Sequence, residues 1–307
     1  MWQRELLKWR QRKLSPWRES HDFSRWEEVN DPELIVDLAN GLLKITINRP
    51  EVGNSLSPSL RDRLSELFEE ASGDIRVRAI LLTGTGKSFC TGADLRSKAP
   101  AKVSTLPYNL DFPDDAPSRP AGSVARMLKT GWQRLILSVF TCEKPVICQL
   151  NGTAAGGGAN LALACDLILM SDQARLIEVF VKRAIVPDAG GCYLLPRLVG
   201  LSRAKEIMLF GDDITPSQAL EWGLVNKVVV HDQLEDLAYQ WATRLAQGPT
   251  RTLAITKNLL NKSLESDIYR ALEDESLAQE AAMLTTTDAN EGVSAFVERR
   301  DPRYRGW

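Results

Sequence analysis

The sequence predicts a mixed α/β fold in which a parallel sheet is followed by a helical C-terminal part. Short apolar runs alternate with helix-forming patterns between residues 35 and 171, and the pattern after Asp188 is mostly helical. Right-handed crossovers organise such alternating strands and helices into a parallel sheet. The composition, with 44% hydrophobic and 25% charged residues, is that of a globular protein with an ordinary core.

The alternating part begins with a strand, a helix and a second strand. Residues 42–47 have a strand pattern that ends at Pro50. Ser57 and Pro58 provide an N-cap and a proline at the first helical position, and an apolar stripe follows. The continuous apolar run 77–83 predicts a buried strand. Farther along the chain, we expect a helix near 123–141, a strand at 145–150, a helix at 157–165 and a strand at 167–171.

The C-terminal part is predicted to be helical. The expected helices cover residues 202–210, 215–222, 232–247, 249–264 and 267–287. We divide the chain into an N-terminal arm (1–32), a core that carries the functional site (33–200) and a helical C-terminal region (201–307). The proline-containing stretch 97–123 predicts either a segment that covers a substrate or a disordered loop.

The N-terminal arm is rich in tryptophan. Trp2, Leu6 and Trp9 fall at helical spacing, so we expect a short amphipathic helix that packs on the body or on a neighbouring subunit. The alternative is a transit peptide, and Glu5 and Glu19 count against its acid-poor composition.

The composition disfavours several classes of function. A net charge of −2 provides no basic field for nucleic acid or an anionic membrane. The apolar stretch 161–170 contains Cys165 and Asp166 and is too short to span a bilayer. Five cysteines without CxxC spacing disfavour a disulfide framework and a zinc site, so a reducing compartment, the cytoplasm, is expected. His21 and His231 are the histidines of the chain, which disfavours a Ser-His-Asp triad or a histidine-rich metal site.

Two glycine-rich segments are candidates for a functional site. They are GTGKSFCTGADL (84–95) and KPVICQLNGTAAGGGANLALACDL (144–167), and each follows a predicted buried strand and leads into a helix. Such turns present bare N–H groups to an anion, because the first turn of a helix has unpaired donors. Either segment alone is more typical of a structural turn, because glycine turns after strands are common. The phosphate-loop motif GxxxxGK[ST] and the full dinucleotide motif GxGxxG are absent from the sequence.

Taken together, the two segments resemble the two halves of the oxyanion hole in the crotonase (enoyl-CoA hydratase/isomerase) superfamily. The resemblance covers about residues 40–300 and includes NRPEVGNSLS (48–57), VRAILLTG (77–84), PRLVGLSRAKEIMLFGDDITPSQALEWGLVNKVV (196–229) and EGVSAFVERRDPRY (291–304). It implies a crotonase-like spiral of ββα repeats with a helical C-terminal region for trimerisation, and hence a homotrimer or homohexamer. It also implies an acyl-CoA thioester as substrate, with no metal and no separate cofactor, because CoA arrives with the substrate.

The resemblance assigns roles to individual positions. The backbone N–H groups of Ala93 and Gly157 match the donors that bind the thioester oxygen as it becomes enolate-like. The positions matched to CoA binding lie in two backbone segments and near the C-terminus: Val52, Asn54, Ser55, Leu56, Asp94, Leu95, Arg96, Phe296 and Arg299. Phe296 and Arg299 are expected to reach CoA, within the subunit or across a subunit boundary. Helix packing is the alternative role for Phe296.

The family's hydratases use two glutamates to activate water, and Asn160 and Phe180 occupy those positions here. Neither side chain can act as a base, so both are expected to line the substrate site. The ring-epoxide isomerases of phenylacetate degradation resemble this chain in KPVIC, NGxAAG, LLPRLVG and EGVSAF, and they also lack both acids. They carry instead an aspartate at the position of Asp188, which moves a proton between the α and γ carbons. Without the resemblance, Asp188 would be expected to cap the following helix. Glu178 is a spare candidate base and is expected at the solvated surface.

The sequence therefore favours an enoyl-CoA isomerase that shifts a double bond by 1,3-proton transfer through an enolate. Asp188 is the expected base, and partial burial is expected to raise its pKa. Two alternatives stay open: hydration or other enolate chemistry with an unusual base, and a catalytically silent subunit that binds acyl-CoA. The expected partner is an acyl-CoA; neither nucleic acid nor a membrane is expected.

Overall fold

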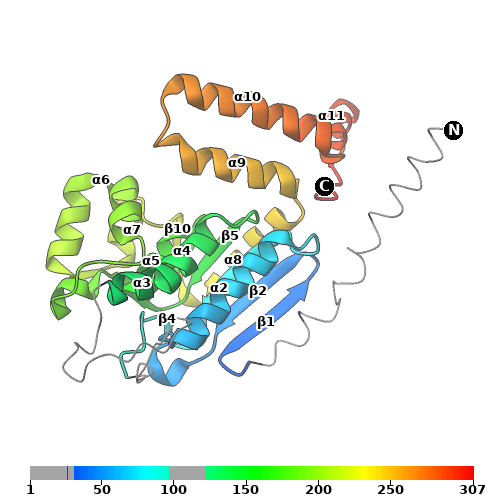
Figure 1. Cartoon of the computed structure of the whole chain (residues 1–307). Coiled ribbons are helices and arrows are strands. Elements are labelled where there is room, and N and C mark those ends of the chain that lie inside the picture. The colour runs from blue at the N-terminus through cyan, green and yellow to red at the C-terminus, as the bar shows by residue number, and fades with distance from the viewer. Residues whose placement is uncertain (1–25, 27–30, 97–121) are drawn as a thin grey trace, which may run out of the picture.

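A sheet of six strands in the described part of the chain forms the centre of the body (Figure 1). The computed structural model describes Trp26 and residues 31–96 and 122–307. The strands are β1 (Leu34–Ala39), β2 (Leu42–Ile47), β3 (Ala79–Gly84), β5 (Val146–Leu150), β7 (Leu167–Ser171) and β10 (Lys227–Val229). In the order β1-β2-β3-β5-β7-β10, β1 and β2 are antiparallel and every later pair is parallel, which confirms the predicted parallel sheet.

A second sheet in the described residues contains four short strands. They are β4 (Ser88–Cys90), β6 (Thr153–Ala155), β8 (Arg175–Ile177) and β9 (Asp213–Ile214), in the order β4-β6-β8-β9. Strands β4, β6 and β8 directly follow β3, β5 and β7 of the larger sheet, and a helix follows β6. This repeat confirms the predicted ββα architecture. The short strands themselves were not predicted, because two or three residues are too few for a periodic pattern.

Helices surround the two sheets. They are η1 (Pro50–Val52), α2 (Pro58–Gly73), α3 (Ser123–Thr130), α4 (Trp132–Phe140), α5 (Gly157–Leu163), η2 (Val179–Arg183), α6 (Gly191–Phe210), α7 (Pro216–Glu221) and α8 (His231–Ala246). Helix α2 begins as predicted, because the Ser57 hydroxyl accepts a hydrogen bond from Leu60 N at 3.2 Å. The helix predicted near 123–141 is divided in two at Gly131, whose φ of −107° and ψ of −103° are not helical. A Cβ at Gly131 would lie 2.4 Å from Arg61 Cζ, so a larger residue there would require the Arg61 guanidinium to move.

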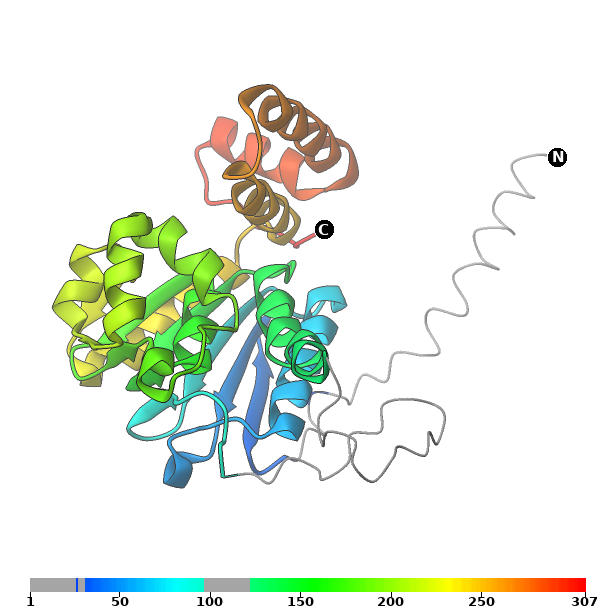
Figure 2. The same cartoon turned by 60° about the vertical axis from the view of Figure 1, so that its left-hand side comes forward.

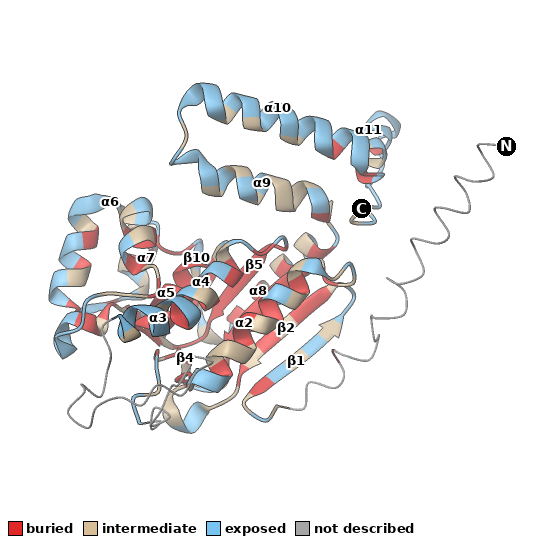
Figure 3. Cartoon of the chain, in the orientation of Figure 1, coloured by how far each residue is buried: buried red, intermediate tan, exposed pale blue. Residues whose placement is uncertain are grey.

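The central strands β3 and β5 of the large sheet are buried on both faces, whereas the edge strand β1 is partly exposed (Figure 3). In β3, Ile80 and Leu82 belong to the core cluster that includes α2, whereas Leu81 packs with α8 on the opposite face. This two-sided burial explains why the run 77–83 has no polar face. Truncating one of these side chains to alanine would cost about 2–5 kcal/mol of the free energy of unfolding.

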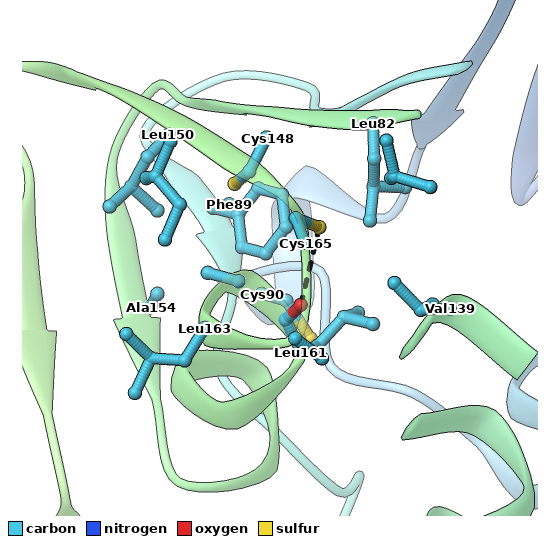
Figure 4. Packing of buried hydrophobic residues seen from close by; sticks show 14 of the residues in the cluster. Leu82, Phe89, Cys90, Val139, Cys148, Leu150, Ala154, Leu161, Leu163 and Cys165 are labelled. Atoms are coloured by element: carbon cyan, nitrogen blue, oxygen red, sulfur yellow. Dashed lines mark hydrogen bonds between the residues drawn. The ribbon is translucent and has the colours of Figure 1, made fainter. Parts of the chain in front are cut away.

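Cysteine side chains from β4 and β5 fill part of the hydrophobic core (Figure 4). Cys90, Cys148 and Cys165 are buried near Phe89, and Cys165 Sγ donates to Leu161 O at 3.4 Å. All five cysteines are free thiols. The four buried ones, Cys90, Cys142, Cys148 and Cys165, act as small apolar core residues, whereas Cys192 is exposed.

Little of the predicted arm, and almost none of the predicted loop 97–123, lies within the described residues. Trp26 is an exception: it is buried, and its Nε1–H donates to Asp74 Oδ2 at 2.7 Å. This residue of the arm therefore packs on the body. The helix predicted around Trp2 and Trp9 lies outside the described residues.

Helices α9 (Thr250–Ser263), α10 (Ile268–Thr285) and α11 (Asp288–Glu298) follow α8, and α10 and α11 stand away from the body (Figures 1 and 2). Lys257 ties α9 to the body, because its Nζ lies 2.8 Å from Asp166 Oδ2. The region exposes many large apolar side chains: Leu260, Leu264, Ile268, Tyr269, Leu272, Leu277, Met283, Leu284, Val293, Phe296 and Val297. Helix α11 was not predicted. Within the described residues, no helix combines the length and the apolar character that crossing a membrane requires.

Candidate active site

The two glycine-rich segments meet at Gly92. This residue has a φ of 92°, and a Cβ there would lie 3.4 Å from Gly157 N, so glycine permits the close approach. Leu56 holds the segment in place: its N–H donates to Gly92 O at 2.8 Å, and its carbonyl accepts from Asp94 N at 2.9 Å. As a result, the backbone N–H groups of Ala93 and Gly157 lie on neighbouring segments.

Close contacts explain the glycine triplet at the start of α5. Gly156 has a φ of 54° and a ψ of −123°, which side chains disfavour. A Cβ at Gly157 would lie 2.7 Å from the Trp132 ring, and one at Gly158 would lie 2.0 Å from Cys90 O. Within the described chain, neither Gly157 N–H nor Ala93 N–H donates a hydrogen bond. Two fixed N–H groups that are free in this way can together donate hydrogen bonds to a developing oxyanion.

Helix α4 supplies an apolar wall beside these donors that was not predicted as part of the site. Trp132 is 6% exposed and contacts Gly157 through its ring. Ile136, one turn later, packs against Gly190, since a Cβ added there would lie 3.2 Å from the Ile136 side chain. The i, i+4 spacing of the two residues is visible in the sequence and indicates a shared helix face. Their position over the glycine segments depends on tertiary packing and therefore cannot be seen in the sequence.

Asp188 lies half-buried in the turn before α6. Its carbonyl accepts from Asn160 Nδ2 at 2.9 Å and from Gly191 N at 3.2 Å. Burial raises the pKa of the Asp188 carboxyl. The alternative role as a helix cap is wrong, because Gly190 is the N-cap of α6 and no side chain caps it. Ala189 has a φ of 52°, unfavourable for a residue with a side chain, so the surrounding structure holds this turn in a strained conformation.

Asn160 and Phe180 lie beside this turn and the glycine triplet. Asn160 is fully buried in α5, and its amide joins that helix to the backbone of Asp188. Phe180 is 8% exposed in η2, and its ring would lie 3.6 Å from a Cβ at Gly156. Neither side chain ionises, so neither can exchange a proton with a substrate.

Glu178 is predicted at the solvated surface, and this prediction is wrong. Its side chain is 2% exposed, and neither carboxylate oxygen has a hydrogen-bond partner among the described residues. Burial and then the charge of Asp188 raise the pKa of Glu178 to about 8, and the Asn160 amide opposes this rise. The residue directly follows the short strand β8, and distant elements enclose it: the turn before α6 brings Asp188 near it, and α5 brings Asn160.

Over residues 37–106 and 117–306, the sequence matches the family described as enoyl-CoA hydratase/isomerase. The chain belongs to the enoyl-CoA hydratase/isomerase family. The resemblance stated from the sequence is thereby confirmed, and the two sheets and the helical C-terminal part agree with the fold expected from it. The protein is an enzyme of this family.

Relatives in the enoyl-CoA hydratase/isomerase family carry the names of both reactions. The chain is 34% identical over 273 residues to 1,2-epoxyphenylacetyl-CoA isomerase from Escherichia coli (strain K12), covering 89% of this chain and 98% of the relative. It is 33% identical over 278 residues to 2,3-dehydroadipyl-CoA hydratase from the same organism, covering 89% and 99%. The solved structure of an enoyl-CoA hydratase from Bacillus anthracis matches with a TM-score of 0.78 and 32% identity, covering 90% of this chain and all of that one.

Asn54 and its neighbours, matched to CoA binding in the family, form a tightly bonded loop. Asn54 is fully buried; its Oδ1 accepts from Arg49 N at 2.8 Å, and its Nδ2 donates to Ser88 O at 2.6 Å. Arg49 was not predicted as a site residue. Its Nη1 donates to Ser55 O at 2.7 Å, and its Nη2 lies 3.1 Å from Asp94 Oδ2. The Asn54 side chain therefore stabilises the loop, and Val52, half-buried, ends the short helix η1 before it.

The other matched positions are more accessible. Leu95 is 71% exposed and the Arg96 side chain 70% exposed, next to Asp94. Phe296 is 85% exposed on α11, so the alternative of helix packing within its own chain is wrong. Arg299 ends α11 with a φ of 56°, and α11 lies far from α5 in Figure 1. Among the described residues, no cluster of three acidic, histidine or cysteine side chains is placed to hold a metal ion.

Proposed function

We propose that this protein is an enoyl-CoA isomerase-type enzyme that shifts a double bond by 1,3-proton transfer on an acyl-CoA thioester. The observation that best supports the proposal is the half-buried Asp188, whose backbone Asn160 ties to α5, the helix that begins at Gly157. Asn160 and Phe180 stand where the family's hydratases carry glutamates, so the pair of acids that positions water is missing. A single carboxylate suits a reaction in which the same group removes and returns a proton.

In the proposed reaction, the thioester oxygen accepts hydrogen bonds from Ala93 N–H and Gly157 N–H. Both donors are fixed by backbone packing, so they need no reorganisation as charge develops on the oxygen. Asp188 removes the α proton, and the C–H electron pair moves into a dienolate whose charge rests on the thioester oxygen. The dienolate then takes the proton back from Asp188 at the γ carbon, and the double bond ends between the α and β carbons.

The surroundings of Asp188 fit this role. Burial raises the pKa of its carboxyl toward the operating pH, which favours both removal and return of a proton. The apolar surfaces of Trp132, Ile136 and Phe180 exclude water from the neighbourhood of the glycine segments. We propose no metal and no separate cofactor for the reaction.

Glu178 favours one second candidate, hydration or other enolate chemistry with an unusual pair of acids. The charge of Asp188 contributes to the raised pKa of Glu178, so the two carboxyl groups lie close enough to interact. Two interacting carboxyl groups with separated pKa values can act as acid and base on one substrate.

We also propose that α9, α10 and α11 mediate assembly into a homotrimer or a dimer of trimers. The exposed apolar side chains of this region support the proposal, because large apolar patches mark interaction surfaces. In such an assembly, Phe296 and Arg299 would meet CoA bound to a neighbouring subunit.

The proposed reaction is tested by comparing the turnover of two substrates in water, a β,γ-enoyl-CoA and an α,β-enoyl-CoA. We expect the β,γ substrate to be converted to the α,β isomer, followed by NMR or chromatography, without hydroxyacyl-CoA. Rapid formation of hydroxyacyl-CoA from the α,β substrate would instead establish the second candidate. Binding of both substrates without turnover would identify a catalytically silent member of the family.

A further inference from the structure

Glu178 is a buried acid to which the proposed reaction gives no part. Its side chain is 2% exposed, and its two oxygens have no hydrogen-bond partner among the described residues. Burying an ionised carboxylate without a donor is strongly unfavourable. Asn160 is near enough for its amide to lower the pKa of Glu178, against the larger rise from burial. Its Nδ2 donates to Asp188 O at 2.9 Å, but its Oδ1 is buried without a partner among the described residues.

A proton on Glu178 would remove the buried charge and provide a donor for Asn160 Oδ1. A neutral carboxylic acid gains an O–H donor, and Asn160 Oδ1 is the acceptor that lacks one. The orientation of the amide is fixed, because the Asp188 carbonyl can only accept and must face Nδ2.

We propose that Glu178 is a positioning residue: as a neutral acid, it donates to Asn160 Oδ1 and so holds the amide that fixes the backbone of Asp188. The inference rests on the proposed function, because it takes Asp188 as the base. The backbone of this turn is strained at Ala189, so a hydrogen bond that fixes the neighbouring Asp188 would help to keep the turn in its strained conformation.

The neutral state also decides which of the two acids carries the negative charge. Burial, and secondly the charge of Asp188, raise the pKa of Glu178 to about 8. Asp188 is the less buried of the two and therefore the one that ionises first. Among the described groups around Glu178, α5 presents the uncharged Asn160 and the turn before α6 presents Asp188, and these are the side chains that influence its pKa.

The proposal predicts a loss of activity in alkaline solution. Above about pH 8, Glu178 ionises, loses its O–H donor and places a second negative charge near Asp188. We expect the turnover of the wild-type protein to fall by about tenfold per pH unit beyond that point, as for a single essential proton. Glu178→Gln supplies an amide N–H that does not titrate, so this decline should disappear in the variant.

The test is a pH–rate profile of the wild-type protein and three variants on the enoyl-CoA that the wild type turns over. E178Q should keep the turnover at pH 7 within about tenfold, the usual range for exchanging one hydrogen bond, and should lose the alkaline decline. E178L supplies no donor and should lose about tenfold or more of the turnover across the whole pH range. Asp166→Asn is the control: Asp166 is another acid with a raised pKa, but its side chain is 22% exposed and paired with Lys257, so its replacement should leave the alkaline decline in place.

Two results would overturn the proposal. The first is an E178Q variant with the same alkaline decline as the wild-type protein. The second is a loss of more than about 100-fold in E178Q at pH 7, which would mark Glu178 as a proton-transfer group instead. If the wild-type protein turns over neither enoyl-CoA, the proposed function fails. The proposed role of neutral Glu178 is then tested without substrate, by measuring how the melting temperature depends on pH. The same pH dependence in the wild-type protein and in E178Q would overturn the proposal.

Discussion

Replacing Glu178 with glutamine should change how the stability of the protein depends on pH. The side chain is 2% exposed, and burial is the largest cause of the rise in the pKa of its carboxyl from 4.5 to about 8. A glutamine has nearly the same size and stays neutral at every pH. The variant therefore isolates the free energy of burying this one titrating group.

The sign follows from proton binding. Between pH 4.5 and about 8, the folded protein keeps the Glu178 proton while the unfolded chain has released it. The folded state then binds more protons than the unfolded state, so the free energy of unfolding falls as pH rises through this window. At about 1.4 kcal/mol per pKa unit, the loss approaches 5 kcal/mol above pH 8. E178Q should lack this loss.

The assay is urea unfolding of both proteins at pH 5, 6.5 and 8.5. Near pH 5, the two free energies of unfolding should differ by no more than about 1 kcal/mol, the usual worth of exchanging one hydrogen bond. At pH 8.5, the variant should be the more stable of the two by several kcal/mol, on the order of the stability that the wild-type protein loses as Glu178 titrates. Other titrating groups are common to both proteins and cancel in the difference.

A difference that stays constant from pH 5 to pH 8.5 would refute the reasoning, because Glu178 would then titrate alike in both states. Asp188→Asn provides a second check. The charge of Asp188 contributes to the raised pKa of Glu178, so its removal should move the stability loss to lower pH. An unchanged pH window in that variant would contradict the electrostatic interaction between the two acids.

Three further predictions concern the oxyanion donors, the ligand and the assembly. Gly157→Ala places a Cβ 2.7 Å from the Trp132 ring, so turnover should fall by about 100-fold or more, whereas Gly73→Ala, with open space around it, should not reduce turnover. A non-reactive acyl-CoA at 100 times its Kd should stabilise the fold by about 2.7 kcal/mol, seen as a higher melting temperature, and no rise would count against an acyl-CoA site. Light scattering should give at least three times the 34.2 kDa of one chain, and a monomer at micromolar concentration would contradict the proposed assembly.

The longer elements could be predicted because their signals are local. Helix α2 has its cap at Ser57, its proline at Pro58 and its apolar stripe within one segment. Strand β3 is almost wholly apolar because both of its faces are buried. The hairpin of β1 and β2 was missed although a signal was present. Asn40 and Gly41 both have positive φ, at 52° and 82°, and Asn-Gly is the strongest short hairpin turn signal.

The site was predictable where it depends on backbone and not where it depends on distant packing. The glycines near Ala93 and Gly157 mark close backbone contacts, so their pattern is visible in the sequence. The burial of Glu178 is not visible there, since it depends on α5 and on the turn before α6, which are separated from Glu178 along the chain. Trp132 was missed for the same reason, because the contact with Gly157 joins two elements that are separated along the chain.

The most direct test of the proposed mechanism is Asp188→Asn, measured for turnover and for acyl-CoA binding on one preparation. If Asp188 is the base, isomerisation should fall by about 10²–10⁴-fold, the usual worth of a positioned acid or base. Binding should persist, because the N–H groups of Ala93 and Gly157 are unchanged, so the loss should lie in kcat. The fold should persist as well, since the Asp188 side chain does not cap α6. A variant that keeps more than about a tenth of the wild-type turnover, well above that range, would contradict the account and exclude Asp188 as the proton shuttle.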